Sequence, residues 1–166
     1  MKLIVISSPV PVPNEHQIIN SLLEEGLGIF HVHKPNFSEQ EIKDFIRKIP
    51  SKYHNKIFLH SDFTKFHSLK KLENNKEKYD YAFLSPIFDS ISKNGYKASF
   101  DLQEVKAKIK EKKIIALGGV DDSKIETCRE LGFAGVAVLG AIWQSSDPVG
   151  KYKSLKALCQ KKDLVF

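Results

Sequence analysis

Short apolar runs alternate with helical patterns along the whole of this 166-residue chain. The runs begin near residues 2, 28, 56, 80, 113 and 134, and their mean spacing of about 26 residues is typical of β-strand–α-helix units. The runs contain few polar residues, as in strands buried on both faces of a parallel sheet. Helices with one apolar face are expected over residues 14–26, 38–49, 67–75, 101–111, 122–131 and 149–160. The pattern predicts an α/β fold.

The number of units limits the choice of architecture. Eight βα units need about 210 residues, so the chain is roughly 40 residues short of a closed eight-stranded barrel. An open doubly wound sheet and a barrel with material missing both fit the six strands expected from the pattern.

Composition and charge exclude several classes of protein. With 42% apolar residues, the chain is too hydrophobic to be disordered. No apolar run approaches the ~20 residues that span a bilayer. The net charge is +6, but the lysine runs near residues 106–113 and 151–162 lack interleaved aromatic side chains, so they are read as solvated faces rather than a nucleic-acid groove. The two cysteines show no disulfide or metal-binding pattern, which indicates a reducing compartment. We therefore expect a cytoplasmic protein without membrane or nucleic-acid partners.

Two histidines lie two residues apart in the second predicted strand. His31 and His33 therefore point to one face of that strand. With His60 and Asp62 they could complete the ligand set of a zinc hydrolase. Packing in the core is the structural alternative for both histidines.

Glycines and hydroxyl side chains follow the later strands. Ser90, Ser92 and Lys93 share one loop and suit a phosphate or pyrophosphate, although a solvated polar loop is the alternative. Backbone N–H groups at strand ends commonly bind phosphate in barrels, although ordinary turn glycines are again the alternative. The candidates for this role are Gly118, Gly119, Leu139 and Gly140.

Three stretches carry a resemblance to a known family. Residues 84–93, 116–120 and 135–142 resemble the thiamine-phosphate synthase and thiazole tautomerase family. The family stretch Gly-Pro-Ile-Phe-x-Thr-x-Thr-Lys is matched with serine at three positions, Ser85, Ser90 and Ser92. The resemblance implies that residues 1–166 form one (β/α)8 TIM barrel domain, in which residues 116–120 and 135–142 end strands seven and eight.

Compared with this family, one piece of the barrel has no counterpart. Residues 59–63 match the end of strand three, whereas residues 64–67 already match the end of strand five. Strand four and its flanking helices are therefore expected to be absent, with a seam near Phe63 and Thr64. A genuine deletion is one explanation. A stretch omitted from the sequence is the favoured one, because a barrel without strand four would expose two unpaired edges.

The resemblance implies a transferase of thiamine biosynthesis. Such an enzyme joins an aminopyrimidine pyrophosphate to a thiazole phosphate and releases pyrophosphate, and Mg²⁺ assists. It implies Asp62 as the magnesium carboxylate, and His67 and Lys93 as catalytic residues. His33 stands where the family usually has the arginine of Gln-x-Arg-x-Lys, and His31 replaces the glutamine. Both histidines are expected to bind phosphate.

Two further functions stay open beside the synthase. His67 favours the thiazole tautomerase of the same family, an isomerase that needs no magnesium. Asp62 and the 90–93 loop favour the synthase, while the lost arginine at His33 counts against it. A barrel that binds phosphate ligands without catalysis is the third reading. The expected partners are small phosphorylated pyrimidines and thiazoles, and a homodimer stays open.

Overall fold

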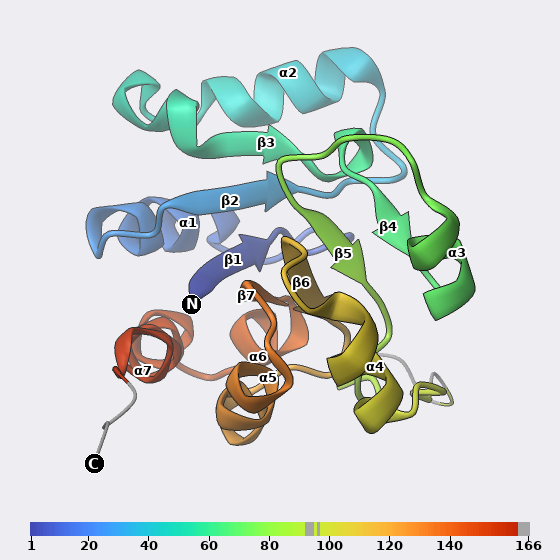
Figure 1. Cartoon of the computed structure of the whole chain (residues 1–166). Coiled ribbons are helices and arrows are strands. Elements are labelled where there is room, and N and C mark those ends of the chain that lie inside the picture. Colours follow the sequence, from blue (N-terminus) through green and yellow to red (C-terminus); the bar gives the residue numbers. More distant parts are fainter. Residues whose placement is uncertain (92–94, 96, 163–166) are drawn as a thin grey trace.

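The structure is a computed structural model that describes residues 1–91, 95 and 97–162. Over these residues, seven parallel strands form one sheet in the order β3-β2-β1-β7-β6-β5-β4 (Figure 1). The strands are β1 (Lys2–Ile6), β2 (Ile29–Val32), β3 (Ile57–Leu59), β4 (Lys65–Phe66), β5 (Ala82–Leu84), β6 (Ile114–Leu117) and β7 (Gly135–Val138).

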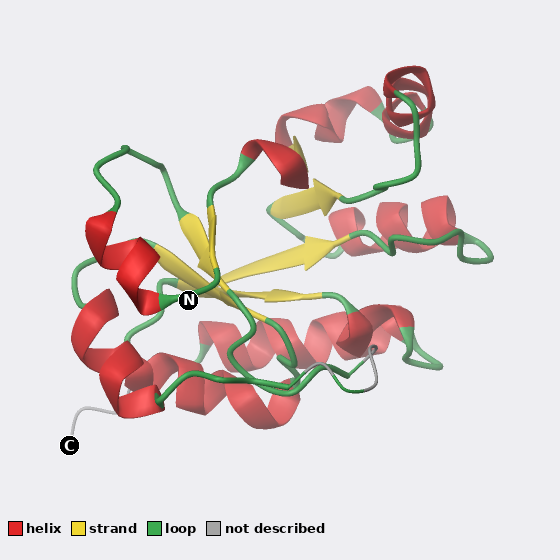
Figure 2. Cartoon of the chain, turned by 90° about the vertical axis from the view of Figure 1, so that its right-hand side faces the viewer, coloured by secondary structure: helices red, strands yellow, loops and turns green. Residues whose placement is uncertain are grey.

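The α-helices lie around the outside of the strands (Figure 2). They are α1 (Glu15–Glu24), α2 (Glu39–Arg47), α3 (Leu69–Asn74), α4 (Leu102–Ile109), α5 (Ile125–Leu131), α6 (Gly140–Trp143) and α7 (Pro148–Gln160), with 3₁₀ turns η1 (Ser51–Lys56), η2 (His60–Asp62) and η3 (Asp122–Lys124). Within the described residues, each helix is too short or too polar to cross a membrane.

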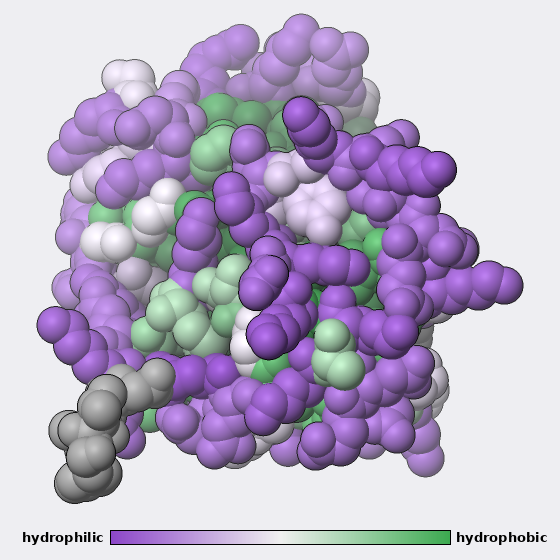
Figure 3. All heavy atoms as spheres, in the orientation of Figure 1, coloured by the Kyte–Doolittle hydropathy of each residue, from purple (hydrophilic) through white to green (hydrophobic). Residues whose placement is uncertain are grey.

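Most strand residues are apolar, because both faces of the central strands are covered. Ile4 and Ile6 of β1 pack in an inner cluster with Phe83 and Ile115, whereas Val5 between them packs in the outer core beneath the helices. This alternation is the period of two that a strand imposes. Hydrophilic residues cover most of the face seen in Figure 3, and hydrophobic residues are exposed in patches between them.

Side-chain caps begin two of the helices that the sequence pattern predicts, those expected over residues 38–49 and 101–111. The Ser38 hydroxyl accepts from the Glu41 N–H, and the Glu41 carboxylate accepts from the Ser38 N–H, a complete capping box on α2. Asp101 caps α4 by accepting from two backbone N–H groups. Each cap satisfies donors that a helix leaves without intrahelical partners.

The sheet is curled like part of a barrel, and it is open between β3 and β4, the place where strand four was expected to be absent. The chain passes from β3 through η2 directly to β4, and β3 and β4 form the two edges of the sheet. Within the described residues each of them pairs on one side only, with β2 and β5 respectively. Over that part of the chain, the structure therefore has the two unpaired strand edges, on β3 and β4, that are expected when strand four is absent. The pattern of six strands also missed β4, because two residues are too few to show a period.

Candidate functional site

The carboxyl ends of the parallel strands lie together at one end of the sheet, and a cavity of about 170 Å³ opens there. Strands β1, β2, β3, β5, β6 and β7 all contribute to it, either directly or through the residue that follows the strand. Its lining comprises Ile6, His33, His60, Ser85, Ser90, Ile91, Leu117, Gly118, Gly119, Ala137, Leu139 and Gly140. The fold therefore brings together six of the predicted site residues: His33, Ser90, Gly118, Gly119, Leu139 and Gly140.

The two glycines after β6 have left-handed backbones. Their φ angles are +98° at Gly118 and +65° at Gly119, values that residues with a Cβ rarely adopt. A Cβ on Gly118 would lie 2.8 Å from the Cα of Pro86, and one on Gly119 would overlap the carbonyl oxygen of Asp89. Glycine thus lets the ends of β5 and β6 come close together at the cavity.

The end of β7 leads almost directly into a helix. α6 begins at Gly140, and the first N–H groups of a helix have no intrahelical acceptor. The N–H groups of Gly140 and Ala141 are therefore donors that can meet an anion, and Gly140 lines the cavity.

Hydroxyl groups lie on the β5 side of the cavity. Ser85 follows β5 directly, and Ser90 lies further along the same loop. The other two residues predicted for this loop, Ser92 and Lys93, lie outside the described residues. Their phosphate-binding and catalytic roles stay predictions.

A second cavity, of about 460 Å³, adjoins the first on the β2 and β3 side. His33 and His60 line both cavities. Lys65 also lines the second one, and its ammonium donates to the carbonyls of His60 (2.7 Å) and Phe63 (3.1 Å). Burial lowers the pKa of this ammonium. The lining is Val32, His33, Lys34, Pro35, Phe37, Glu39, Ile42, Leu59, His60, Ser61 and Lys65.

His31 does not reach either cavity, contrary to the prediction that it binds phosphate. Its side chain is 0% exposed, and both ring nitrogens have protein partners: Nδ1 lies 3.1 Å from Nδ1 of His60, and Nε2 lies 2.7 Å from the hydroxyl of Tyr81. Burial and the Lys65 ammonium lower the pKa of His31 to about 4. Burial, again with Lys65, lowers the pKa of His60 to about 3. Both rings are therefore neutral at physiological pH.

Lys34 forms a buried ion pair instead of lying free for a ligand. Its ammonium is 2.6 and 2.8 Å from the two carboxylate oxygens of Glu15. The ammonium also lies 5.0 Å from the ring centre of Phe45. Because Glu15 neutralises it inside the protein, Lys34 does not supply the charge of the family's lysine.

His67 follows β4 and is exposed. Its Nδ1 lies 3.1 Å from the carbonyl oxygen of Ser85, which can only accept, so Nδ1 carries the hydrogen. In the neutral ring this leaves Nε2 as an acceptor, the form that a general base needs. His67 is not among the residues that line either cavity, so its catalytic role stays a prediction.

The metal donors expected from the sequence do not come together. Asp62 is exposed, is absent from both cavity linings, and interacts electrostatically with the Lys65 ammonium. The described residues contain no group of three His, Cys, Asp or Glu side chains arranged to hold a metal ion. Both ring nitrogens of His31 already have protein partners, His60 and Tyr81, so His31 offers no nitrogen to a metal ion. These donors fit neither a zinc site nor a magnesium ion held by the protein alone.

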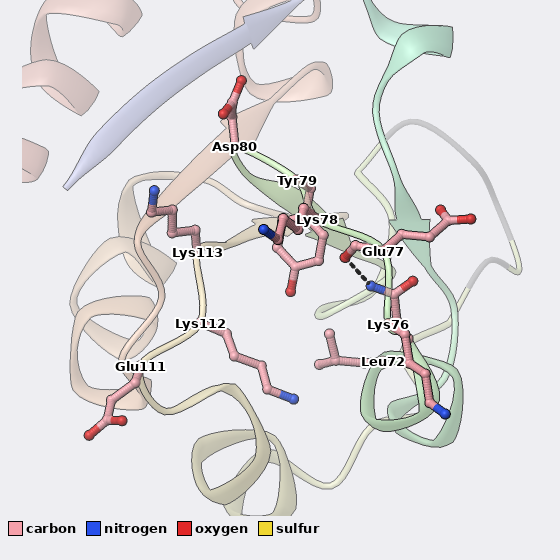
Figure 4. A pocket seen from close by; sticks show the side chains of 10 residues that line it. Leu72, Lys76, Glu77, Lys78, Tyr79, Asp80, Glu111, Lys112 and Lys113 are labelled. Carbon is pink, nitrogen blue, oxygen red and sulfur yellow. Dashed lines mark hydrogen bonds between the residues drawn. The ribbon is translucent and has the colours of Figure 1, made fainter.

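A larger hollow, of about 700 Å³, lies at the opposite end of the sheet, where β5 and β6 begin. Figure 4 shows Lys112 and Tyr79 reaching into it, while Glu111 and Asp80 point away. A hydrogen bond from the Asn75 amide to the Glu77 carbonyl closes one side. Its lining is mostly long charged side chains. It lacks the glycines and buried polar groups that line the cavity at the carboxyl ends of the strands. We therefore place the site at the carboxyl ends of the strands.

Three residues that contribute to the site at the carboxyl ends of the strands were not recognised from the sequence. The sequence indicates His60 only as a zinc ligand and Lys65 only as a possible phosphate contact, and it does not reveal the buried contacts of Tyr81 and Lys65. The signal for His60 was its position directly after a strand, the same signal that identified Gly118. Nothing in the sequence spacing shows that residues 50 apart, such as His31 and Tyr81, share a hydrogen bond.

A parallel β/α sheet with glycine strand ends around one cavity is the arrangement of phosphate-binding β/α-barrel proteins. Comparison with known sequences is more specific. The family model described as "Thiamine monophosphate synthase" matches residues 64–142, just under half of the chain. The curated thiamine-phosphate synthase of Limosilactobacillus reuteri is 28% identical over 87 residues, and that of Haemophilus influenzae (strain PittGG) is 32% identical over 89 residues. These alignments cover 51% and 52% of this chain, but only 40% and 39% of the relatives.

Solved structures extend the similarity over nearly the whole fold. The crystal structure of thiamine phosphate pyrophosphorylase from Bacteroides thetaiotaomicron superposes with a TM-score of 0.78 and 28% identity, covering 95% of this chain and 97% of that one. The thiamine phosphate pyrophosphorylase from Pyrococcus furiosus gives a TM-score of 0.75 at 16% identity, covering 96% and 95%, and at that identity it supports the fold alone. The resemblance to the thiamine-phosphate synthase family is confirmed in sequence and in structure.

Proposed function

We propose that this chain is a thiamine-phosphate synthase-like transferase acting on an aminopyrimidine pyrophosphate and a thiazole phosphate. One observation carries the proposal: strands β6 and β7 end in glycines around the same cavity that His33 and His60 line. The similarity over residues 64–142 spans these two strand ends. The chain spans about two fifths of the length of the curated relatives it matches, so activity and substrates are proposed rather than transferred.

The residues of this chain would act by binding and orienting charged groups. In the reaction, the bond from the pyrimidine methylene carbon to pyrophosphate breaks, the leaving group keeps the electron pair, and the thiazole nitrogen supplies the pair of the new bond. Backbone N–H groups at Gly118–Gly119 and Gly140–Ala141 would hold the thiazole phosphate. The imidazoles of His33 and His60, with the Lys65 ammonium, would face the pyrophosphate in the second cavity. Ser90, Ser92 and Lys93 would complete the phosphate contacts.

A second part of the proposal concerns the opening in the sheet. We infer that the opening between β3 and β4 corresponds to one β/α unit of a (β/α)8 barrel that this chain lacks. The strand order supports this, because β3 and β4 would be next-nearest neighbours around such a barrel. The two buried free thiols, Cys128 and Cys159, fit the reducing environment of a cytoplasmic enzyme.

Thiazole tautomerase is the second candidate, and His67 favours it. An isomerisation moves a proton, and the Nδ1 contact of His67 to Ser85 leaves Nε2 free of that contact to take it. Such a reaction needs no leaving-group cations, so the missing arginine at His33 would not matter.

Product formation tests the proposal. Purified protein is supplied with both substrates, with and without Mg²⁺, and thiamine phosphate is measured by chromatography. We expect thiamine phosphate in the presence of Mg²⁺, and at least about tenfold less with His33→Asn, because one pyrophosphate contact is lost. His54→Asn, which removes an exposed histidine outside both cavities, serves as the matched control.

The outcomes separate the alternatives. No product from saturating substrates would reject the synthase. Interconversion of thiazole phosphate isomers that is lost in His67→Asn would then identify the tautomerase. Thermal stabilisation by thiazole phosphate without any turnover would identify a phosphate-ligand binding protein.

A further inference from the structure

Three side chains, one in a strand and two directly beside other strands, form a continuous chain of hydrogen bonds inside the sheet. Tyr81 precedes β5, His31 lies in β2, and His60 follows β3. The Tyr81 hydroxyl is 2.7 Å from Nε2 of His31, and Nδ1 of His31 is 3.1 Å from Nδ1 of His60. The three residues are 7%, 0% and 5% exposed, so water hardly competes for these bonds.

The direction of these hydrogen bonds follows from the Tyr81 hydroxyl. A phenol has one hydrogen to donate, and a buried donor without an acceptor costs more than an unused lone pair. Burial raises the pKa of Tyr81 to about 12, so its hydrogen is retained. Nε2 of His31 is the acceptor that the described residues offer it. The Tyr81 O–H therefore donates to His31.

The first bond determines the tautomers of both histidines. Neutral His31 accepts at Nε2 and so carries its hydrogen on Nδ1. It donates that hydrogen to Nδ1 of His60, which therefore carries its own hydrogen on Nε2. Aromatic rings surround the pair: Phe63 lies 4.5 Å from His31 between ring centres, and Phe83 lies 5.0 Å from His60. These rings offer no competing acceptor and hold the imidazoles in place.

We propose that Tyr81 and His31 are positioning residues that hold His60 with its hydrogen on Nε2, as a fixed donor to an oxyanion in the cavities that it lines. Because His60 then has no basic nitrogen free, it binds and does not abstract protons. The choice of pyrophosphate as that oxyanion rests on the proposed function. The tautomer of His60 does not.

Nitrogen NMR tests the positioning directly. Long-range ¹H–¹⁵N spectra of protein labelled at histidine nitrogen distinguish the two tautomers of each ring. We expect His60 to carry its hydrogen on Nε2 in the wild type, and to show a mixture of tautomers in Tyr81→Phe, which lacks only the hydroxyl. Tyr79→Phe removes a phenol hydroxyl outside the chain of bonds and should leave His60 unchanged. A wild-type His60 with its hydrogen on Nδ1, or an unchanged His60 in Tyr81→Phe, would overturn the proposal.

Binding of inorganic pyrophosphate, measured by calorimetry, tests the use of the donor. His60→Gln keeps an N–H near the Nε2 position, whereas His60→Asn places its amide near Nδ1 and leaves Nε2 empty. We expect His60→Gln to bind within about threefold of the wild type, and His60→Asn and Tyr81→Phe to bind about tenfold and about threefold more weakly. Melting curves followed by circular dichroism establish that each variant is folded.

Failure of this assignment can be told apart from failure of the proposed function. Equal binding by His60→Asn and the wild type would overturn the donor role of His60, whatever the activity. Absence of pyrophosphate binding by the wild type would overturn the oxyanion and the proposed function together. The expected tautomers in the NMR spectra would still support the positioning by Tyr81 and His31.

Discussion

Individual residues of the strand-end site depend on backbone conformation as much as on side chains. Gly119 combines a φ of +65° with a position where any Cβ overlaps the Asp89 carbonyl. We expect Gly119→Ala to lower the free energy of unfolding by about 2 kcal/mol or more, because strain and overlap add. Denaturant unfolding measures this. Gly28→Ala, where a Cβ meets nothing within 4 Å, is the control, and equal stability of the two variants would contradict the argument.

The buried His31 makes stability depend on pH. Its pKa is lowered from 6.5 to about 4 on folding, so the unfolded chain takes up the proton first as pH falls. Its contribution to stability is complete above pH 6.5 and is lost progressively as the pH falls towards 4. Between pH 7.5 and pH 5, urea unfolding should show a loss of about 2 kcal/mol from this residue. His31→Asn should remove that part of the slope, and exposed His54→Asn should not. An unchanged slope in His31→Asn would show that other groups cause it.

Sequence spacing predicted the face of these histidines but not their depth. His31 and His33 do lie on one face of their strand, about 7 Å apart along it. In a curled sheet, that distance separates the packed interior from the rim. His33 therefore lines both cavities, whereas His31 is fully buried.

At the scale of elements, a buried ion pair joins the start of α1 to the loop after β2. The side chains of Lys34 and Glu15 are 0% and 9% exposed. Lys34→Met leaves the Glu15 carboxylate buried without its partner, and should cost about 3–5 kcal/mol in unfolding free energy. Lys43→Met breaks the exposed pair with Glu39 and should cost less than about 1 kcal/mol. Similar costs for the two variants, measured by urea unfolding, would contradict this account.

The elements found from sequence are those with a repeated signal. Long apolar runs such as β1 and the capped helix α2 were predicted because periodicity and capping are local properties. β4 has two residues and α6 has four, so neither displays a period. β4 forms because it pairs with β5, and α6 forms where the chain leaves the end of β7. Both depend on tertiary contacts.

For the whole molecule, the open sheet predicts uneven protection from hydrogen exchange. β1 lies between β2 and β7, whereas β3 and β4 are the edges. Amides of β3 and β4 should exchange more than about tenfold faster than those of β1 and β7, because edge strands open locally at low cost. Exchange followed by NMR measures this within one molecule. Equal protection would mean that the edges are covered in solution, as in a homodimer, and a sedimentation measurement would then give the oligomeric state.

The α/β class, the parallel sheet, most helices and the glycine strand ends follow from the sequence alone, because hydrophobic period, capping and turn chemistry act over a few residues. Three features became visible in the fold alone: the opening between β3 and β4, the pairing of Lys34 with Glu15, and the chain of hydrogen bonds through Tyr81, His31 and His60. The ion pair and the hydrogen bonds join residues 19 to 50 positions apart. Contacts between residues so far apart depend on how the strands pack and how the sheet curls, and a local sequence pattern does not predict either.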